Sequence, residues 1–425
     1  MDHRVEPGDD DFQMEIKEMR MKIAVIFIIA AVLTLGATAS AEMSGDVVKI
    51  GVLSDMSGLY SDIGGPGSVE AARMAIADFG GSLHGKKIEL VSAGHQTRPD
   101  VGSVIATQWF GSDGVDAIVD VPNSSVALAV QEIARNKNKV LLVSGAAASD
   151  LTGKACSPTS VHWTYDTLAL ANGTGAALVK AGGDTWFFIT ADYAFGHDLE
   201  AQTSAVVKQM GGQVVGGVRV PLNTSDFSSY LLQAQSSKAK VIGLANAGGD
   251  TINSVKQAAE FGIVKAGQRM AGLLVFITDV NSLGLDVAQG LQFTEAFYWD
   301  MNDDTRAWTK RFVEKMNGRL YPTMNHAGNY GGMLHYLKAV EAAQTTDGVK
   351  VVQKMKELPT KDVTFGEGRV REDGRHMHPM YLWQVKKPAE SKAKWDYYTL
   401  VKMIPADEAW RPLDQGGCPL VAKKS

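Results

Sequence analysis

The stretch Val47–Phe79, VVKIGVLSDMSGLYSDIGGPGSVEAARMAIADF, contains the elements that decide the fold of this chain. Its residues 47–53 are almost continuously apolar and predict a buried parallel strand. Its residues 71–79 place apolar side chains at helical spacing and predict an amphipathic helix. The loop between them supplies the hydroxyl of Tyr60 and several glycines that let the backbone approach another molecule closely. Because open α/β sheets bind ligands where a strand ends and a helix begins, this loop is a candidate binding site.

The residues upstream of this stretch have the pattern of a secretory signal peptide. Arg20 and Lys22 precede the apolar run Ile23–Leu35, and the small residues Ala39–Ala41 then provide a cleavage site. The run is shorter than the roughly 20 apolar residues that a membrane-spanning helix needs, although an uncleaved anchor is the alternative. We therefore assign residues 1–41 to a leader and signal peptide.

Length and composition predict an exported globular protein of two domains. Even without its leader the chain is longer than one ordinary hydrophobic core supports, and 45% of its residues are hydrophobic. The formal net charge of −5 offers no basic surface to nucleic acid or to an anionic membrane. The two cysteines are Cys156 and Cys418, and an isolated pair in an exported chain is most simply one disulfide. Two independent thiols are the alternative.

Strands and helices alternate along most of the chain. After the opening stretch, strands are predicted at Lys87–Ser92, Ala117–Val119 and Val140–Val143, with helices between them. A second alternation has predicted strands at Thr185–Ile189, Gln213–Val220, Val241–Ala245 and Leu273–Ile277. This rhythm predicts an α/β fold with two doubly wound lobes, each built on a central parallel sheet.

Motifs of catalysis and of metal binding are incomplete in this sequence. The glycines of Gly65–Glu70 lack the third member of a dinucleotide fingerprint, and no GxSxG nucleophile elbow occurs. His376 and His378 form an HxH pair without a cysteine or an HExxH partner. We therefore predict no enzyme activity, no cofactor and no metal.

Several segments are arranged as in a known family. Besides Ile50–Leu53, Ser57–Gly58 and Gly64–Gly65 in the opening stretch, the most specific segments are Asp192–Gly196, Asn246–Asp250 and Phe365–Gly368. Together they resemble the periplasmic solute-binding proteins of ABC importers, in the branched-chain amino acid group. Three further runs are similar to the subgroup that takes up aromatic carboxylates, namely His162–Asp166, Asn223–Phe227 and Trp395–Tyr398.

The resemblance implies a type I periplasmic binding protein fold, in which a three-stranded hinge joins two lobes. The helices predicted between residues 305 and 356 then return to the first lobe, and the last strands cross back to the second. The first lobe is accordingly predicted at 42–164 plus 297–377, and the second at 165–296 plus 378–425. The three crossings are expected near Tyr165, Ala296 and His378.

Three loops of the first lobe are expected to line the cleft between the lobes. Tyr60 lies in the first, and its ring is expected to cover the ligand. The other two loops follow the next strands, and their candidate binding residues are Asn123, Ser124, Ser125, Ser144, Gly145, Ala146 and Ala147. The resemblance implies that Ser124 and Ser125 hold a ligand carboxylate together with the backbone of residues 145–147. Plain helix N-capping is the alternative for Asn123 and Ser124.

The second lobe is expected to contribute Tyr193, Asn246 and Asp279. The resemblance implies that an aromatic residue at the first position packs on the ligand. It also implies that an acid near the third position, often Glu, pairs with the ammonium of an amino acid. Asp279 is one methylene shorter, which argues against such a ligand, and a surface-loop acid is the alternative. Tyr165, at the first crossing, either faces the cleft or braces the hinge.

The sequence therefore predicts a monomeric periplasmic receptor that closes over a small carboxylate and delivers it to an ABC permease in the inner membrane. An aromatic acid is the expected ligand, with a branched-chain or other amino acid as the alternative. An exported enzyme would need a nucleophile or a cofactor loop, and a sensory domain would need a signalling partner.

Overall fold

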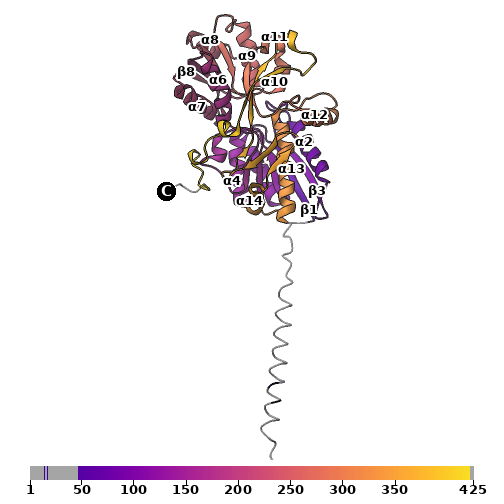
Figure 1. The fold of residues 1–425 in the computed structure, drawn as a ribbon. Helices are drawn as coiled ribbons and strands as arrows, with labels where there is room; N and C mark the ends of the chain where they lie inside the picture. Colours follow the sequence, from indigo (N-terminus) through magenta and orange to yellow (C-terminus); the bar gives the residue numbers. More distant parts are fainter. Residues whose placement is uncertain (1–13, 15–16, 18–45, 422–425) are drawn as a thin grey trace, which may run out of the picture. The chain divides into compact units, whose positions relative to one another are not determined.

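The computed structural model describes residues 14, 17 and 46–421, and the chain divides into two compact units, Met1–Glu42 and Met43–Ser425. In the first unit only Met14 and Lys17 are described, both helical and exposed. The signal peptide predicted within residues 1–41 otherwise lies outside the described residues. All further elements belong to the second unit, whose ribbon Figure 1 shows.

A six-stranded sheet forms the centre of the first lobe, in the order β2-β3-β1-β4-β5-β6. Its neighbouring strands run parallel, except that β2 pairs antiparallel with β3. Strands β4 and β5 are buried throughout, as their continuous apolar runs predict. The six strands are β1 Val47–Ser54, β2 Ser82–Leu83, β3 Lys86–Gly94, β4 Ala117–Asp120, β5 Val140–Val143 and β6 Ser160–His162.

Helices cover both faces of this sheet. Leu53 of β1 shares a core cluster with Trp109 of α3 and Val126 of α4, whereas Ile50, on the opposite face of β1, belongs to another cluster. That second cluster includes α12, α13 and α14, and α13 lies along α2 (Figure 1). The helices are α2 Gly65–Phe79, α3 Pro99–Gly111, α4 Ser124–Lys137, α12 Asp303–Lys315, α13 Met324–Ala343 and α14 Gly348–Glu357.

A four-stranded parallel sheet forms the centre of the second lobe, in the order β10-β9-β7-β8. Its strands are β7 Thr185–Ala191, β8 Gln213–Val220, β9 Val241–Ala245 and β10 Arg269–Gly272. The first helical segment contains a π-helical turn, Ala171–Gly175, between two short α-helices. The helices of this lobe are α5 Thr167–Leu170, α6 Ala176–Lys180, α7 Ala194–Gln209, α8 Ser228–Ser236, α9 Gly249–Glu260, α10 Ile277–Leu283 and α11 Leu285–Ala288.

Two small antiparallel sheets complete the fold. One contains β11 Gln292–Glu295, β15 Met380–Val385 and β16 Tyr398–Ile404. The other contains β12 Thr360–Asp362, β13 Gly366–Val370 and β14 His376–Met377, and the short helix α15 spans Ala406–Ala409. The predicted α/β class with two doubly wound lobes is confirmed. The lobe boundaries stay a prediction, because the two compact units separate only residues 1–42 from the rest.

One predicted strand is wrong. The apolar run Leu273–Ile277 does not form a strand, since β10 ends at Gly272 and helix α10 begins at Ile277. The residues between them form a fully buried connection. A short apolar run has no periodicity that separates a strand from other buried segments, so burial alone explains this stretch.

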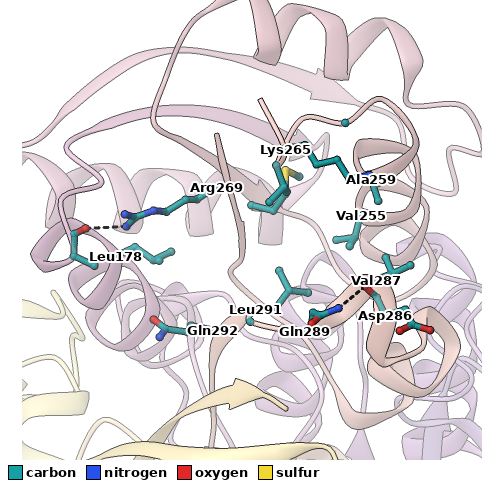
Figure 2. A pocket seen from close by; sticks show the side chains of 15 residues that line it. Leu178, Val255, Ala259, Lys265, Arg269, Asp286, Val287, Gln289, Leu291 and Gln292 are labelled. Carbon is teal, nitrogen blue, oxygen red and sulfur yellow. Dashed lines mark hydrogen bonds between the residues drawn. The ribbon is translucent and has the colours of Figure 1, made fainter. Parts of the chain in front are cut away.

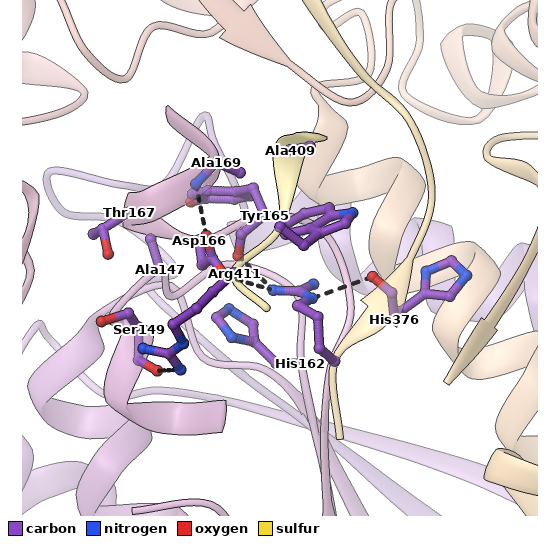
Figure 3. A network of polar contacts seen from close by, with 12 residues as sticks. Ala147, Ser149, His162, Tyr165, Asp166, Thr167, Ala169, His376, Ala409 and Arg411 are labelled. Atoms are coloured by element: carbon purple, nitrogen blue, oxygen red, sulfur yellow. Dashed lines mark hydrogen bonds and ion pairs between the residues drawn. The ribbon is translucent and has the colours of Figure 1, made fainter. Parts of the chain in front are cut away.

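Buried Arg375 joins segments that are distant in the sequence. Figure 3 shows Tyr165, Asp166 and His376 of these segments close to one another. Its guanidinium donates hydrogen bonds to the carbonyl oxygens of Tyr165, at 3.0 Å, and His376, at 3.2 Å. It lies 3.9 Å from the carboxylate of Asp166 and stacks over the ring of Trp410 at 4.3 Å. Asp166 in turn caps helix α5 by accepting the N–H of Ala169 at 2.8 Å. One cation therefore joins the predicted first and third crossings to the C-terminal segment.

The predicted disulfide between Cys156 and Cys418 is confirmed. Both cysteines are buried, and 262 positions separate them in the sequence. The bond fixes the C-terminal segment to the residues just before β6. In the chain-entropy account a crosslink that closes such a long loop stabilises the fold by restricting the unfolded chain.

Replacing both cysteines, as Cys156→Ser with Cys418→Ser, is expected to lower the free energy of unfolding by about 2–5 kcal/mol. Urea denaturation of the unreduced wild type and the double variant measures this difference. A thiol titration of the denatured, unreduced wild type is the control, and two free thiols there would contradict the crosslink.

Candidate functional site

A small cavity lies where loops from both lobes meet. Its volume in the described, closed arrangement is about 10 Å³. The first lobe contributes the loops that follow β1, β4 and β5, at the carboxyl ends of parallel strands, where open α/β sheets bind ligands. Thirteen residues line the cavity: Tyr60, Ile63, Pro122, Ser124, Gly145, Ala146, Ala147, Tyr165, Tyr193, Phe195, Ala247, Leu274 and Phe276.

Ser124 is the polar side chain that lines the cavity at the first residue of helix α4. Its Oγ accepts the backbone N–H groups of Ala147 and Ala148, both at 3.2 Å. A hydroxyl that accepts two hydrogen bonds keeps its own proton to donate. Asn123 caps the helix by accepting the N–H of Val126 at 3.1 Å, so the capping interpretation is confirmed for Asn123. The start of α4 therefore presents a hydroxyl proton and unpaired helix N–H groups toward the cavity.

The loop that leads into α4 is strained. Asp120 has φ 83° and Val121 has φ 54°, a conformation that a β-branched residue rarely adopts. The carboxylate of Asp120 accepts the hydroxyl of Ser54 at 2.5 Å and the amide of Asn325 at 2.9 Å. Burial raises the pKa of Asp120, while these hydrogen bonds oppose the rise. Such strain persists where the surroundings fix it, and it clusters at functional sites.

Tyr60 and Tyr193 meet across the cavity from opposite lobes. Their hydroxyl oxygens are 2.8 Å apart, so one hydroxyl donates to the other. Burial raises the pKa of both phenols, and their proximity raises that of Tyr60 further, so both stay neutral. Tyr165 donates to the carbonyl oxygen of Gly145 at 2.5 Å, and its pKa is also raised by burial. Tyr165 therefore faces the cavity as well as standing at the predicted first crossing.

The backbones of the two lobes approach closely beside this tyrosine pair. Gly248 has φ 59°, and a Cβ atom there would lie only 2.8 Å from the carbonyl oxygen of Leu59. Any other residue at position 248 would clash with the first lobe and strain its own backbone. The described arrangement is thus one in which the two lobes are closed on each other.

Seven of the predicted binding residues lie in the cavity wall, and five do not. Ser144 is buried and Ser125 is partly exposed, and neither lines the cavity. The amide of Asn246 bonds within the second lobe, to the hydroxyls of Thr251 at 2.7 Å and Ser254 at 3.1 Å. Asn123, Ser125, Ser144, Asn246 and Asp279 are the five outside the wall.

Asp279 occupies a helix rather than the loop predicted for it. It is the third residue of α10, is 2% exposed, and accepts the N–H of Phe276 at 3.0 Å. The surface-loop alternative is therefore wrong as well. Burial raises the pKa of Asp279 to about 7. Glu295 lies near it, and burial followed by the charge of Asp279 raises the pKa of Glu295 strongly. Asp279 is therefore about half-charged near pH 7.

Several wall residues were not predicted from the sequence. Pro122 and Ala247 belong to loops that were already candidates, so their place in the loop could have identified them. Leu274 and Phe276 lie in the run that was interpreted as a strand. Because this run was interpreted as a strand, its residues were not considered as wall residues, although their aromatic and apolar character suits a ligand pocket.

A larger cavity, of about 640 Å³, lies within the second lobe (Figure 2). Arg269 and Met270, at the start of β10, line it together with Val255, Ala259 and Leu291. It contains no predicted site residue and none from the first lobe. Its position at the amino end of β10 is opposite to the strand ends that bind ligands in this architecture. We therefore take the interlobe cavity as the functional site.

Residues 14, 17 and 46–421 contain neither a metal-binding cluster nor a membrane-spanning helix. No group of three or more His, Cys, Asp and Glu side chains in these residues is arranged to hold a metal ion. Within the same residues, none of the helices has the length and apolarity that a membrane crossing requires.

Comparison with known proteins agrees with this geometry. A sequence profile of the family described as periplasmic binding protein matches residues 47–393. A periplasmic binding protein from Burkholderia mallei is 50% identical, with a TM-score of 0.86, over 88% of this chain and 99% of that one. A branched chain amino acid ABC transporter periplasmic ligand-binding protein from Burkholderia xenovorans LB400 is 42% identical, with a TM-score of 0.78 and the same coverage.

A more distant structure shows the fold alone. It is a solute binding protein of an ABC transporter from R. palustris in complex with benzoate, 20% identical, with a TM-score of 0.76 over 88% of this chain and 99% of that one. The type I periplasmic binding protein fold predicted from the sequence is confirmed. Because the family profile spans most of the chain, the protein belongs to the periplasmic binding protein family.

Proposed function

We propose that this protein is the substrate-binding component of an ABC uptake system and closes its two lobes over a small aromatic carboxylate. The observation that carries the proposal is the interlobe cavity, which combines an anion-binding helix start with an aromatic, uncharged wall. The relatives named above are transport-associated binding proteins, which agrees with a receptor rather than an enzyme.

The start of α4 is the expected carboxylate site. Ser124 can donate its hydroxyl proton, and the N–H groups at the start of this 14-residue helix have no intrahelical acceptor, although Asn123 already accepts that of Val126. Hydrogen bonds to a carboxylate are about twice as strong as neutral ones, and the helix dipole favours a negative charge at this end. The carboxylate therefore needs no cationic side chain in the wall.

The remainder of the wall suits a ring better than an ammonium group. Its aromatic members are Tyr60, Tyr165, Tyr193, Phe195 and Phe276, and none of the thirteen wall residues, all of which are described, carries a charged side chain. A buried ammonium without a carboxylate partner would lose its hydration uncompensated. Asp279 does not supply that partner, because it lies outside the wall and caps Phe276.

A branched-chain or other amino acid is the second candidate. The relative from Burkholderia xenovorans is named for branched-chain amino acids and is 42% identical to this chain. The benzoate complex shows that the fold itself can enclose a ring-bearing acid. The choice between these ligand classes for this chain depends on the uncharged wall.

The remaining proposals concern location and partners. Arg20, Lys22 and the run Ile23–Leu35 are proposed to export the chain to the periplasm. There the protein is proposed to act as a monomer that delivers its ligand to a membrane permease. The ligand-binding roles of the seven predicted residues that lie in the wall are part of this proposal.

Titration calorimetry with benzoate, 4-hydroxybenzoate and leucine tests the ligand class. Benzoates are expected to bind with a Kd in the micromolar range or below, and leucine is expected to bind at least about a hundredfold more weakly, since its ammonium lacks a partner. Tight leucine binding with no benzoate binding would favour the amino acid candidate. Failure of every small carboxylate to bind the folded protein would contradict the proposal.

Ser124→Ala is expected to weaken benzoate binding by about ten- to a hundredfold, because a hydrogen bond to a charged group contributes roughly 1.5–3 kcal/mol. Ser125→Ala is the matched control, since it removes a hydroxyl from the next residue of the same helix but outside the wall. Its Kd should stay within about twofold of the wild type. Equal losses in both variants would argue against the particular role of Ser124.

A further inference from the structure

A carboxylate from the second lobe holds the first lobe next to the cavity. Asp198 lies on α7, the helix that packs on β7, β8 and β9. Its two oxygens accept the backbone N–H of Ser149 at 2.6 Å and the hydroxyl of Ser149 at 3.0 Å. They also accept the hydroxyl of Thr167 at 2.5 Å and the amide of Gln202 at 3.1 Å. Ser149 belongs to the first lobe, because it follows strand β5.

Ser149 is the last residue of a segment that forms one side of the cavity. We call Ser144–Ser149 the anchor loop. At its beginning, the N–H groups of Ser144 and Gly145 bond to the carbonyl oxygen of Asp120 at 3.2 Å. In its middle, Ser124 binds Ala147 and Ala148. At its end, Asp198 of the other lobe accepts both the N–H and the hydroxyl of Ser149. Ser149 also accepts the amide of Gln202 at its hydroxyl oxygen and the guanidinium of Arg411 at its carbonyl oxygen, both at 3.3 Å.

We propose that Asp198 is a positioning residue for ligand binding: it fixes the anchor loop when the lobes close, and so couples closure to the order of the cavity wall. This role deepens the proposed function and rests on it, although Asp198 itself lies outside the cavity wall. A receptor whose binding-competent state is only partly populated binds its ligand more weakly in proportion to that fraction. Loss of Asp198 lowers that fraction without removing a ligand contact.

Glu200 offers a matched comparison on the same helix. Its carboxylate accepts the hydroxyl of Thr190 at 2.6 Å and pairs with Arg219, and both partners belong to the second lobe. Asp198 and Glu200 are therefore acids two residues apart with full sets of partners. They differ in that one of them reaches across to the first lobe.

The first experiment measures hydrogen–deuterium exchange of residues 144–152 in the full chain without any added acid, for the wild type, Asp198→Ala and Glu200→Ala. Exchange in Asp198→Ala is expected to be at least about tenfold faster, since hydrogen bonds to a charged group are lost. Exchange in Glu200→Ala is expected to match the wild type. Equal exchange in all three proteins would overturn the proposal, whichever ligand the protein binds.

The second experiment titrates benzoate into the same proteins. Asp198→Ala is expected to raise the Kd at least about tenfold, mainly through a faster off-rate, while Glu200→Ala stays within about twofold. Asp198→Asn keeps one acceptor oxygen and is expected to fall between them, which a general loss of stability would not produce. It also serves as the second variant where Asp198→Ala fails to fold.

The outcomes separate this inference from the proposed function. If wild-type protein binds no benzoate, the proposed ligand class fails while the exchange experiment still decides the role of Asp198. If benzoate binds and both alanine variants keep the wild-type Kd, the positioning role is wrong and the ligand class stands. Ser149→Ala combined with Asp198→Ala should weaken binding less than the sum of the two single effects, because the hydroxyl bond that Ser149→Ala removes is one of the bonds that Asp198→Ala also removes. If the effects of the two substitutions on the binding free energy were fully additive, the positioning role of Asp198 would be contradicted.

Discussion

The buried carboxyl group of Asp120 and the backbone around it set the geometry on which the cavity depends. The side chain joins Ser54, at the end of β1, to Asn325 of α13, and Ser54 also accepts the N–H of Gly65 at the start of α2. The carbonyl oxygen of Asp120 accepts the first two N–H groups of the anchor loop. A single residue at the end of β4 thus holds the loops that follow β1, β4 and β5. To make all of these contacts, the backbone of Asp120 and Val121 adopts a strained left-handed conformation. The surrounding hydrogen bonds hold it in that conformation.

This constraint explains which parts of the site the sequence could predict. Ser124, Tyr60 and residues 145–147 follow strands whose apolar runs are clear, and the carboxyl ends of parallel strands must meet at one edge of a sheet. Asp279 and Phe276 follow an apolar run without periodicity, so neither the helix α10 nor the direction of the Asp279 carboxylate could be predicted. The contact of Asp198 with Ser149 joins residues 49 positions apart in different lobes. No local pattern marks such a contact, because it depends on how the two lobes are placed.

In the proposed function, one part of the cavity wall binds the charged group of the ligand and another part contacts its apolar body. An anion that leaves water must recover its lost hydration from donors that are already in place. Here the helix start and the Ser124 hydroxyl supply those donors, and Ser124 is oriented because it accepts two backbone N–H groups. The tyrosines on the other sides are neutral, since burial raises the pKa of Tyr60 and Tyr193. They contribute apolar area and hydroxyl groups without a second charge, so in the proposed function selectivity among carboxylates depends on the body of the ligand and on its lack of an ammonium group.

The crossing segments are held by a buried charge, whereas the two sides of the cavity are joined by a neutral hydrogen bond. Arg375 binds the carbonyl oxygens of Tyr165 and His376, which lie on neighbouring crossing segments, and its ring partner Trp410 lies on the C-terminal segment. Removing one partner from a buried charge is costly, so these segments are held together as a unit. Between the lobe faces, by contrast, Tyr60 and Tyr193 share one neutral hydrogen bond, which water can replace at little net cost. Contacts between the lobes are therefore strong along the crossings and at Asp198, and weak across the cavity, so the tyrosine contact over the cavity can break without loosening the hinge.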